Sequence, residues 1–175
     1  MRIFCSLIGE AGGSESVYSL LKYAYRLVYG ETLPEIKKTA NGKPYFPEKP
    51  DIHFSLSHSR THVLCGLSAS PIGVDIETPR HLDEKVKKYF VSPEELLLFD
   101  PLELWVLKES YIKLLGETIG MARHIQFSRD GKKIIPPGEK VFSKLYRIED
   151  CFAAVSSLEA KPAETIEIVP PVLIE

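Results

Sequence analysis

Apolar and polar residues follow two different periods along this chain. Where they alternate one by one, the pattern predicts strands, because successive side chains of a strand point to opposite faces. Strands are expected at residues 1–9, 53–57, 63–67, 72–77, 125–127, 133–135, 141–148, 151–156 and 165–169. Where apolar residues return every three or four positions, the pattern predicts helices, which are expected at residues 14–29, 83–90 and 102–115.

Residues that commonly begin and end helices flank these segments. Ser14 is expected to cap the first helix, and Gly30 is expected to end it. Ser92 and Asp100 are each followed by proline, which indicates two further helix starts. Gly116 is expected to end the last helix.

The predicted elements fall into two halves of similar order. Each half offers helices and antiparallel strands, although the sequence itself does not repeat, and residues 78–80 (TPR) mark the junction. We therefore predict an α+β fold with an N-terminal lobe at residues 1–78 and a C-terminal lobe at residues 79–175.

Composition narrows the class of protein. The chain has 175 residues, 44% hydrophobic and 26% charged, so a soluble globular fold is expected. The net charge of −2 argues against a nucleic-acid binder. The apolar runs are too short for a secretory signal or a membrane span, so a cytoplasmic protein is expected. Cys5, Cys65 and Cys151 lie far apart in apolar runs and are expected to be buried free thiols.

Two acidic residues interrupt an apolar strand. Asp75 and Glu77 lie in residues 73–77 (GVDIE). A strand places both carboxylates on one face, roughly 7 Å apart. Such a pair can bind one divalent cation, and Mg²⁺ is the ion that carboxylates and phosphate oxygens favour, with Mn²⁺ as an alternative. The same spacing also fits a solvated strand face that carries two acids by chance.

A third acid lies on the last predicted helix. Glu109 and Lys113 are four residues apart and share one face, and Lys108 lies about 100° around the helix. A surface ion pair is the ordinary explanation of this spacing. The helix is otherwise rich in large apolar residues, however, so charges embedded in it need partners.

Polar residues that suit phosphate form a further group. Lys43 and Pro44 lie in a turn, and Ser57 and His58 end a predicted strand, where hydroxyl, imidazole and backbone N–H groups can bind phosphate. Incidental polar residues at a turn and a strand end would give the same pattern. A Ser–His nucleophile pair is disfavoured, because adjacent strand residues face opposite ways.

Four motifs in this order carry a resemblance to a known family. Residues 41–44 (NGKP), 54–59 (FSLSHS), 73–77 (GVDIE) and 105–113 (WVLKESYIK) resemble the motif set of the 4′-phosphopantetheinyl transferases, in the larger, surfactin-synthetase-activating type. The resemblance is strongest over residues 41–116, and the first segment of this chain is shorter than in that type.

The resemblance implies a specific reaction and fold. Such enzymes transfer phosphopantetheine from coenzyme A to a serine of an apo carrier protein and release adenosine 3′,5′-bisphosphate. The implied fold is a monomer of two lobes related by a pseudo-twofold axis, with coenzyme A in the cleft between them. The implied partner is an acidic acyl or peptidyl carrier protein.

The resemblance also assigns roles to individual residues. Asp75, Glu77 and Glu109 would be the metal ligands, with Glu109 as the base and Lys113 neutralising charge at the reacting phosphate. The residues that would bind coenzyme A are Lys43, Pro44, Ser57, His58, Lys108, Lys113 and, where members often have arginine, Lys22.

Other functions stay open at this point. Another Mg²⁺-dependent enzyme of coenzyme A or nucleotide phosphates, or a coenzyme A-binding module without catalysis, would use similar residues. A basic and apolar docking surface for the carrier protein is hypothesised at residues 85 and 87–90, and a solvated helix face explains the same pattern.

Overall fold

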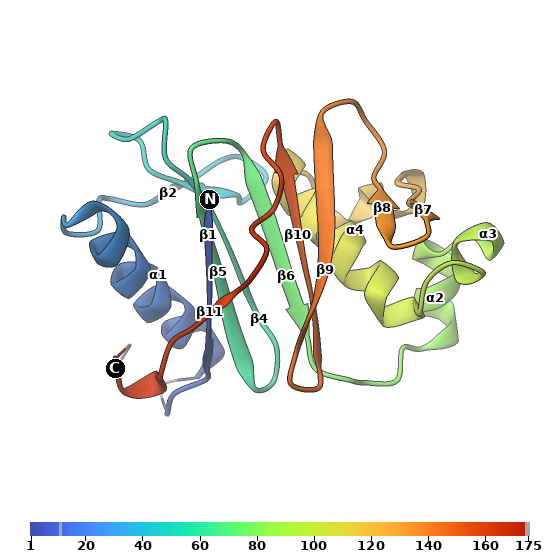
Figure 1. Ribbon diagram of the computed structural model, residues 1–175, viewed down its shortest axis with the longest axis horizontal. Coiled ribbons are helices and arrows are strands. Elements are labelled where there is room, and N and C mark those ends of the chain that lie inside the picture. The colour runs from blue at the N-terminus through green and yellow to red at the C-terminus, as the bar shows by residue number, and fades with distance from the viewer. Residues whose placement is uncertain (11, 174–175) are drawn as a thin grey trace.

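The computed structural model describes residues 1–10 and 12–173, which form four layers in the order helix, sheet, sheet, helix (Figure 1). Helix α1 (Gly13–Tyr29) covers the first sheet, whose strand order is β11-β1-β5-β4. Helix α4 (Pro101–Leu115) covers the second sheet, whose order is β6-β10-β9. The strands are β1 (Arg2–Leu7), β4 (His53–His58), β5 (His62–Ser68), β6 (Ile72–Glu77), β9 (Val141–Ile148), β10 (Cys151–Leu158) and β11 (Glu167–Ile168).

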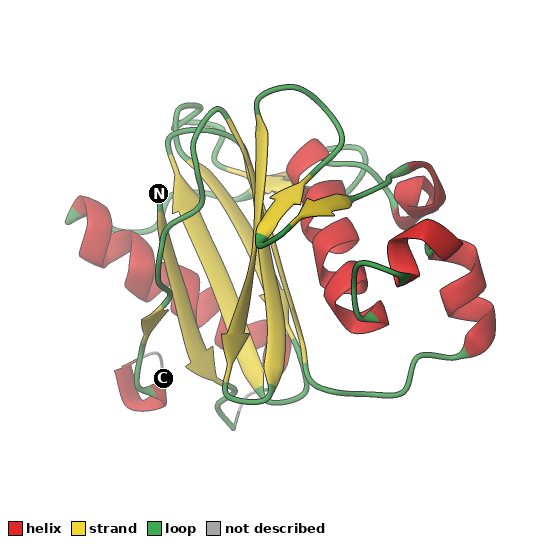
Figure 2. Cartoon of the chain, turned by 45° about the vertical axis from the view of Figure 1, so that its right-hand side comes forward, coloured by secondary structure: helices red, strands yellow, loops and turns green. Residues whose placement is uncertain are grey.

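Shorter elements surround these layers, as Figure 2 shows. They are the helices α2 (Glu84–Phe90) and α3 (Pro93–Leu96), the 3₁₀ turns η1 (Ile119–His124) and η2 (Pro171–Leu173), and the two-stranded pairs β2 (Lys37–Lys38) with β3 (Pro44–Tyr45) and β7 (Ser128–Asp130) with β8 (Lys133–Ile135). The predicted α+β mixture with antiparallel sheets is confirmed. The predicted pseudo-twofold relation between two lobes stays a prediction.

Three hydrophobic clusters hold the layers together, and strand alternation decides which residues join each. On β5, Cys65 faces α1 while Leu64 faces the space between the sheets. On β10, Val155 faces the same inter-sheet space while Ala154 packs under α4. Each sheet is therefore buried on both faces, which explains the dense apolar patterns of its strands.

Each of the two sheets takes strands from both sides of residue 78, the predicted boundary between the lobes, and the two lobes themselves stay a prediction. Strand β6 lies before that boundary, yet it pairs with β10 in the second sheet. Strand β11 lies after it, yet it pairs in parallel with β1 in the first sheet. A hydrophobic pattern identifies strands but not their partners, so the exchange of β6 and β11 could not be read from periodicity.

Two serines join the sheets where β4 and β6 meet. The Oγ atom of Ser55 accepts a hydrogen bond from the backbone N–H of Val74 at 3.0 Å, and that of Ser57 accepts one from Ile76 at 3.4 Å. These side chains satisfy N–H groups at the edge of β6 that no strand pairs with. The seam places the end of β4 directly beside the acidic face of β6.

Helix α4 approaches β6 closely because of Gly73. A Cβ atom at this position would lie 1.9 Å from the carbonyl oxygen of Ser110 and 2.4 Å from the backbone nitrogen of Leu114. Glycine is therefore required by the packing of two backbones, not by its own dihedral angles. Since Asp75 and Glu77 follow on the same face of β6, they also point toward α4.

Most predicted helix ends are confirmed, but one is wrong. Ser92 and Asp100 both form capping boxes, and Gly30 and Gly116 end α1 and α4 in the left-handed conformation. Ser14 does not cap α1. The residue before the helix is Gly12, which has no side chain to donate or accept a capping bond.

The strand predicted at residues 125–127 is also wrong. The chain instead forms η1 and then β7. Ile125 and Phe127 are both buried against α4, which produced the alternating pattern. The backbone N–H of Phe127 donates to the carboxylate of Glu95 at 2.9 Å, so a side chain takes the place of a neighbouring strand.

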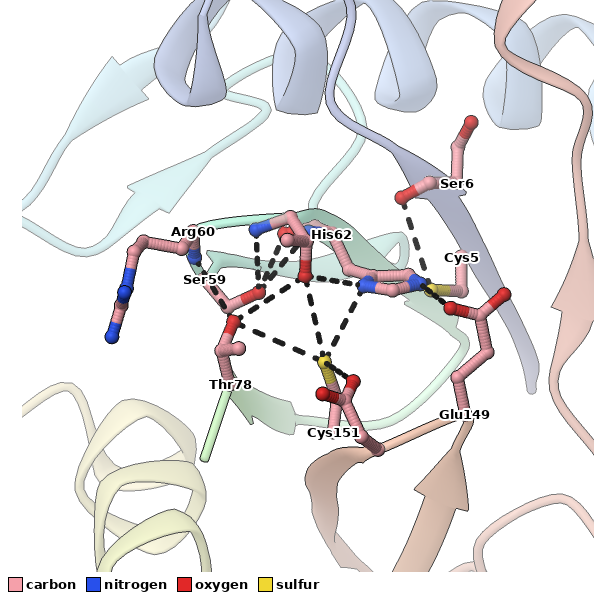
Figure 3. Close-up of polar contacts among 10 residues, drawn as sticks. Cys5, Ser6, Ser59, Arg60, His62, Thr78, Glu149 and Cys151 are labelled. Carbon is pink, nitrogen blue, oxygen red and sulfur yellow. Dashed lines mark hydrogen bonds and ion pairs between the residues drawn. The ribbon is translucent and has the colours of Figure 1, made fainter. Parts of the chain in front are cut away.

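A polar cluster links the two sheets at the turn between β9 and β10 (Figure 3). The Sγ atom of Cys151 lies 3.3 Å from Nδ1 of His62, and Nε2 of His62 lies 3.6 Å from a carboxylate oxygen of Glu149. The three cysteines are buried free thiols, as predicted. The cluster ties the start of β5 to the turn between β9 and β10.

Candidate functional site

A cavity of about 390 Å³ opens where the two halves of the chain meet. The start of α1, the segment around β3, the strand β4 and the end of α4 all contribute to its wall. This volume is within the range of small-molecule sites. Its polar lining includes Ser14, Lys38, Lys43, Ser57, His58 and Lys113.

Three predicted residues meet beside this cavity, and two of them, Ser57 and Lys113, line it. The Oγ atom of Ser57 donates to a carboxylate oxygen of Asp75 at 2.7 Å. The ammonium of Lys113 donates to the same carboxylate oxygen at 2.7 Å and to Ser57 at 3.0 Å. Ser57 comes from the first sheet, Asp75 from the second and Lys113 from α4, so only the folded chain brings them together.

The other two predicted acids lie close to this triangle. Burial raises the pKa of Glu109 to about 7, and the charge of Asp75 adds to this effect, Lys113 opposes it, and Glu77 raises the pKa further. Glu77 is bound to the guanidinium of Arg80 at 3.0 Å. That guanidinium lies 5.4 Å from the ring centre of Trp105, which holds it against α4.

The donor chemistry of the three acids fits a divalent cation. One carboxylate oxygen of Asp75, Oδ2, is buried without a hydrogen-bond partner. The negative charges that raise the pKa of Glu109 are those that a cation would compensate. Within residues 1–10 and 12–173, however, no three His, Cys, Asp or Glu side chains are already arranged to hold a metal ion.

Lys43 and Pro44 both line the cavity. The ammonium of Lys43 donates to the backbone carbonyl of Leu114 at 2.6 Å, and burial lowers its pKa to about 8. Asn41 donates from its amide to the carbonyl of Gly116 at 3.1 Å. These bonds fasten the turn that carries Lys43 to the end of α4, so the two walls of the cavity are joined.

His58 and Lys22 lie in different surroundings. His58 is exposed at the end of β4, and its ring lies against Gly13 at the start of α1, where an added Cβ would be 2.8 Å from Nδ1. Lys22 is exposed further along α1 and does not line the cavity. It lies near Tyr18 in an open depression that adjoins the cavity, because Ser14 and Tyr18 line both.

Lys108 differs from its predicted role at a coenzyme A phosphate. Its side chain is only 3% exposed, and its ammonium lies 2.8 Å from the carboxylate of Glu95. It also donates to the backbone carbonyls of Phe90 and Ala122. All three N–H donors are therefore used within the protein. The position of Lys108 on a different face of the helix from Glu109 explains this, because about 100° separates consecutive residues.

Some cavity residues were not predicted from the sequence. Ser14 and Tyr18 come from α1, and Gly116 and Glu117 from the end of α4. The sequence does give a signal for Gly116, because a glycine that ends a helix leaves room for a neighbouring side chain. Here that side chain is Lys43. No local signal exists for the residues of α1, since their role depends on how the helix lies across the sheet.

Comparison with known proteins gives related sequences. No family model matches the chain. It is 39% identical to 4′-phosphopantetheinyl transferase Sfp of Bacillus subtilis (strain 168) over 90 residues, which are 46% of this chain and 40% of Sfp. It is 33% identical to 4′-phosphopantetheinyl transferase gsp of Aneurinibacillus migulanus over 125 residues, which are 57% of this chain and 52% of that protein.

A further relative is matched over most of both chains. The chain is 30% identical to 4′-phosphopantetheinyl transferase psf-1 of Bacillus pumilus over 169 residues, which are 86% of this chain and 72% of that protein. The chain thus spans about 40% to 52% of Sfp and gsp and more of psf-1. On this match, the chain belongs to the 4′-phosphopantetheinyl transferase family, in its surfactin-synthetase-activating type.

Proposed function

We propose that this protein transfers the 4′-phosphopantetheine group of coenzyme A to a serine of an apo carrier protein, with Mg²⁺, and releases adenosine 3′,5′-bisphosphate. The observation that carries the proposal is the group of Asp75, Glu77 and Glu109 beside Lys113. Lys113 and Ser57, which both bond to Asp75, also line the cavity to which both halves contribute. Acidic oxygens beside a lysine suit a pyrophosphate held by a divalent cation.

Coenzyme A would occupy the cavity, and residues of both halves would bind it. Lys43 and Pro44 line the mouth, where the nucleotide end would lie. Ser57 and His58 line the wall of β4 and offer hydroxyl and imidazole groups to phosphate oxygens. Lys22 lines an adjoining hollow that shares Ser14 and Tyr18 with this cavity, so its contact with a coenzyme A phosphate stays part of the proposal.

The chemical step needs a base and a positive charge near the reacting phosphate. The hydroxyl of the carrier serine attacks the phosphorus that bears the pantetheine arm, and the bond to the oxygen of the adenosine bisphosphate breaks. Glu109 accepts the serine proton, directly or through water, because it is the acidic side chain of α4 beside Asp75 and Lys113. Lys113 compensates the charge that develops on the leaving phosphate.

The three acids would hold Mg²⁺, or Mn²⁺, through carboxylate oxygens. When bound, the ion supplies charge compensation to the pyrophosphate. Ser57 has a supporting part, because its hydrogen bond fixes one oxygen of Asp75 and leaves Oδ2 without a partner. Arg80 has a similar part, because it fixes the carboxylate of Glu77.

The carrier protein would dock beside Trp105. Part of the surface predicted for it is excluded, because Phe90 is buried edge-on against Trp105 and the ammonium of Lys87 is bound to Glu84. Lys88 and Tyr89 are exposed, while the side chain of Lys85 lies outside the described residues. We therefore retain Lys88 and Tyr89 for contact with an acidic acyl or peptidyl carrier.

One assay separates the proposed reaction from its alternatives. The protein is incubated with coenzyme A, Mg²⁺ and an apo carrier protein, and the carrier is weighed by mass spectrometry. A gain of one phosphopantetheine on a serine is expected. Breakdown of coenzyme A without modification of the carrier would indicate a hydrolase, and binding without either reaction would indicate a module that has no transferase activity.

A further inference from the structure

The outer edge of the second sheet is open along β9. This strand has eight residues and pairs with β10 on one side, but within the described part of the chain it pairs with no strand on the other. An unpaired edge presents a row of N–H and C=O groups that another strand can bind. The edge lies on the far side of the sheet from β6 and from the acidic site.

Two hollows follow this edge and join into one trough. A cavity of about 910 Å³ lies along the first part of β9, and one of about 680 Å³ lies along the second part. Both are lined by Lys144, Leu145 and Glu164, so they meet at the middle of the strand. The trough therefore accompanies β9 over most of its length.

The first half of the trough is strongly basic. Lys132, Lys133 and Lys161 line it from the segments that flank β9, and all three are exposed. None of them forms a salt bridge with a described residue, whereas Lys144 on the strand is bound to Glu164 at 2.6 Å. Lysines can also protect an edge strand against aggregation, and Lys144 on β9 fits that role, whereas Lys132, Lys133 and Lys161 lie beside the strand.

The second half is apolar. Ile148, Ile166, Val169 and Pro170 line it together with neighbouring residues. Arg147 also lines this half, and its guanidinium lies 3.9 Å from the ring centre of Phe152. The two halves thus favour different side chains at the two ends of one extended occupant.

We propose that β9 is a docking edge for an extended segment of a partner protein, which adds a fourth strand to the second sheet. The partner segment carries acidic side chains where it lies beside residues 141–145 of this chain, and apolar side chains where it lies beside residues 146–149. Main-chain hydrogen bonds to β9 supply affinity, and the basic and apolar halves of the trough determine its direction. This surface is independent of the proposed transferase site.

The test uses a fluorescein-labelled peptide as long as β9, with eight residues that alternate glutamate and valine in one half and threonine and valine in the other. Fluorescence anisotropy measures binding to the full chain. Lys132→Glu, Lys133→Glu and Lys161→Glu together are expected to weaken binding at least about tenfold. The matched control reverses Lys37, Lys49 and Arg123 to glutamate and is expected to leave binding unchanged.

A second peptide separates strand addition from simple charge attraction. It keeps the glutamates but replaces two valines by proline, which removes N–H donors. It is expected to lose binding, and hydrogen exchange of the β9 amides is expected to slow only with the first peptide. Equal binding of the two peptides would overturn the proposal, and so would unchanged binding of the first peptide by the triple variant. Light scattering that shows two copies of this chain pairing through β9 would also overturn it.

Discussion

At the scale of single residues, Glu109 carries most of the proposed chemistry. Its sequence context, four residues before Lys113 on a helix, is that of an ordinary surface pair. In the structure, burial and the charges of Asp75 and Glu77 raise its pKa to about 7. The residue therefore differs from a surface glutamate first because it is buried, and then because two acids on β6 that are distant in sequence lie near it.

Glu109→Gln is expected to abolish transfer while coenzyme A still binds. The amide keeps the size of the side chain but cannot accept the serine proton, so a loss of at least about 100-fold in turnover is expected. Transfer is measured by the mass of the carrier and binding by calorimetry. Glu139→Gln, at an exposed position, is the matched control. Near-normal turnover of the Glu109 variant would reject its assignment as the base.

Lys43 gives a prediction about pH. Burial lowers its pKa from 10.5 to about 8, so the folded protein releases this proton before the unfolded chain does. Between these values the unfolded state binds more protons, and stability rises with pH. The free energy of unfolding of the wild type minus that of Lys43→Met should therefore increase from pH 8 to pH 10, by on the order of 1 kcal/mol.

Urea unfolding at several pH values measures this difference. The comparison removes the contributions of all other groups, because both proteins share them. A difference that stays constant or falls over the same range would show that the ammonium of Lys43 is as well solvated in the folded state as in the unfolded state.

At the scale of elements, α4 organises both the core and the site. Its end signals were readable from the sequence, because a capping box and a terminal glycine act within one turn. Which face of the helix meets which neighbour was not readable. Apolar residues surround most of the helix, so Lys108 and Lys113 could not be separated into a buried pair and a cavity residue by pattern alone.

Gly73→Ala is expected to disturb the contact between β6 and α4. The added methyl group would overlap the carbonyl of Ser110 and the backbone nitrogen of Leu114, and backbone atoms cannot move aside cheaply. A loss of about 2 kcal/mol or more in the free energy of unfolding is expected, with reduced transfer. Gly120→Ala is the control, because its Cβ would meet nothing closer than 3.7 Å. Equal stability of the two variants would contradict this account.

Lys108→Met is expected to act on stability and not on coenzyme A affinity. It would leave the buried carboxylate of Glu95 without its cation, at a cost of about 3–5 kcal/mol. Unfolding in urea measures the loss, and calorimetry below the unfolding transition measures affinity. If the variant is stable but binds coenzyme A weakly, the original assignment of Lys108 to a phosphate is restored.

At the scale of the whole molecule, the site exists because the two stacked sheets are joined where the edge strands β4 and β6 meet. The serines of β4 bond to β6, and this places Ser57 beside Asp75. No helix in the described part of the chain is long and apolar enough to cross a membrane. The exchange of β6 and β11 between the halves links the two sheets, so the chain cannot be cut at residue 78 without breaking a sheet.

Mg²⁺ is expected to raise the melting temperature of the protein. A cation that binds only the folded state stabilises it by about 2.7 kcal/mol at 100 times its dissociation constant. Asp75→Asn should lose this effect, since it removes a carboxylate with an unpartnered oxygen. Thermal unfolding with and without Mg²⁺ tests both proteins, with Glu139→Gln as control. A shift of equal size in the Asp75 variant would place the ion elsewhere.

The sequence by itself determined the helices, most of their ends, most strands and the alternation that puts Asp75 and Glu77 on one face. These depend on residues within a few positions of one another. Only the tertiary structure decided that β6 leaves the first sheet, that Lys108 is buried while Lys113 reaches Asp75, and that Ser57 bonds to the same carboxylate. Those facts depend on which surfaces pack together, and local spacing carries no record of a partner distant in the chain.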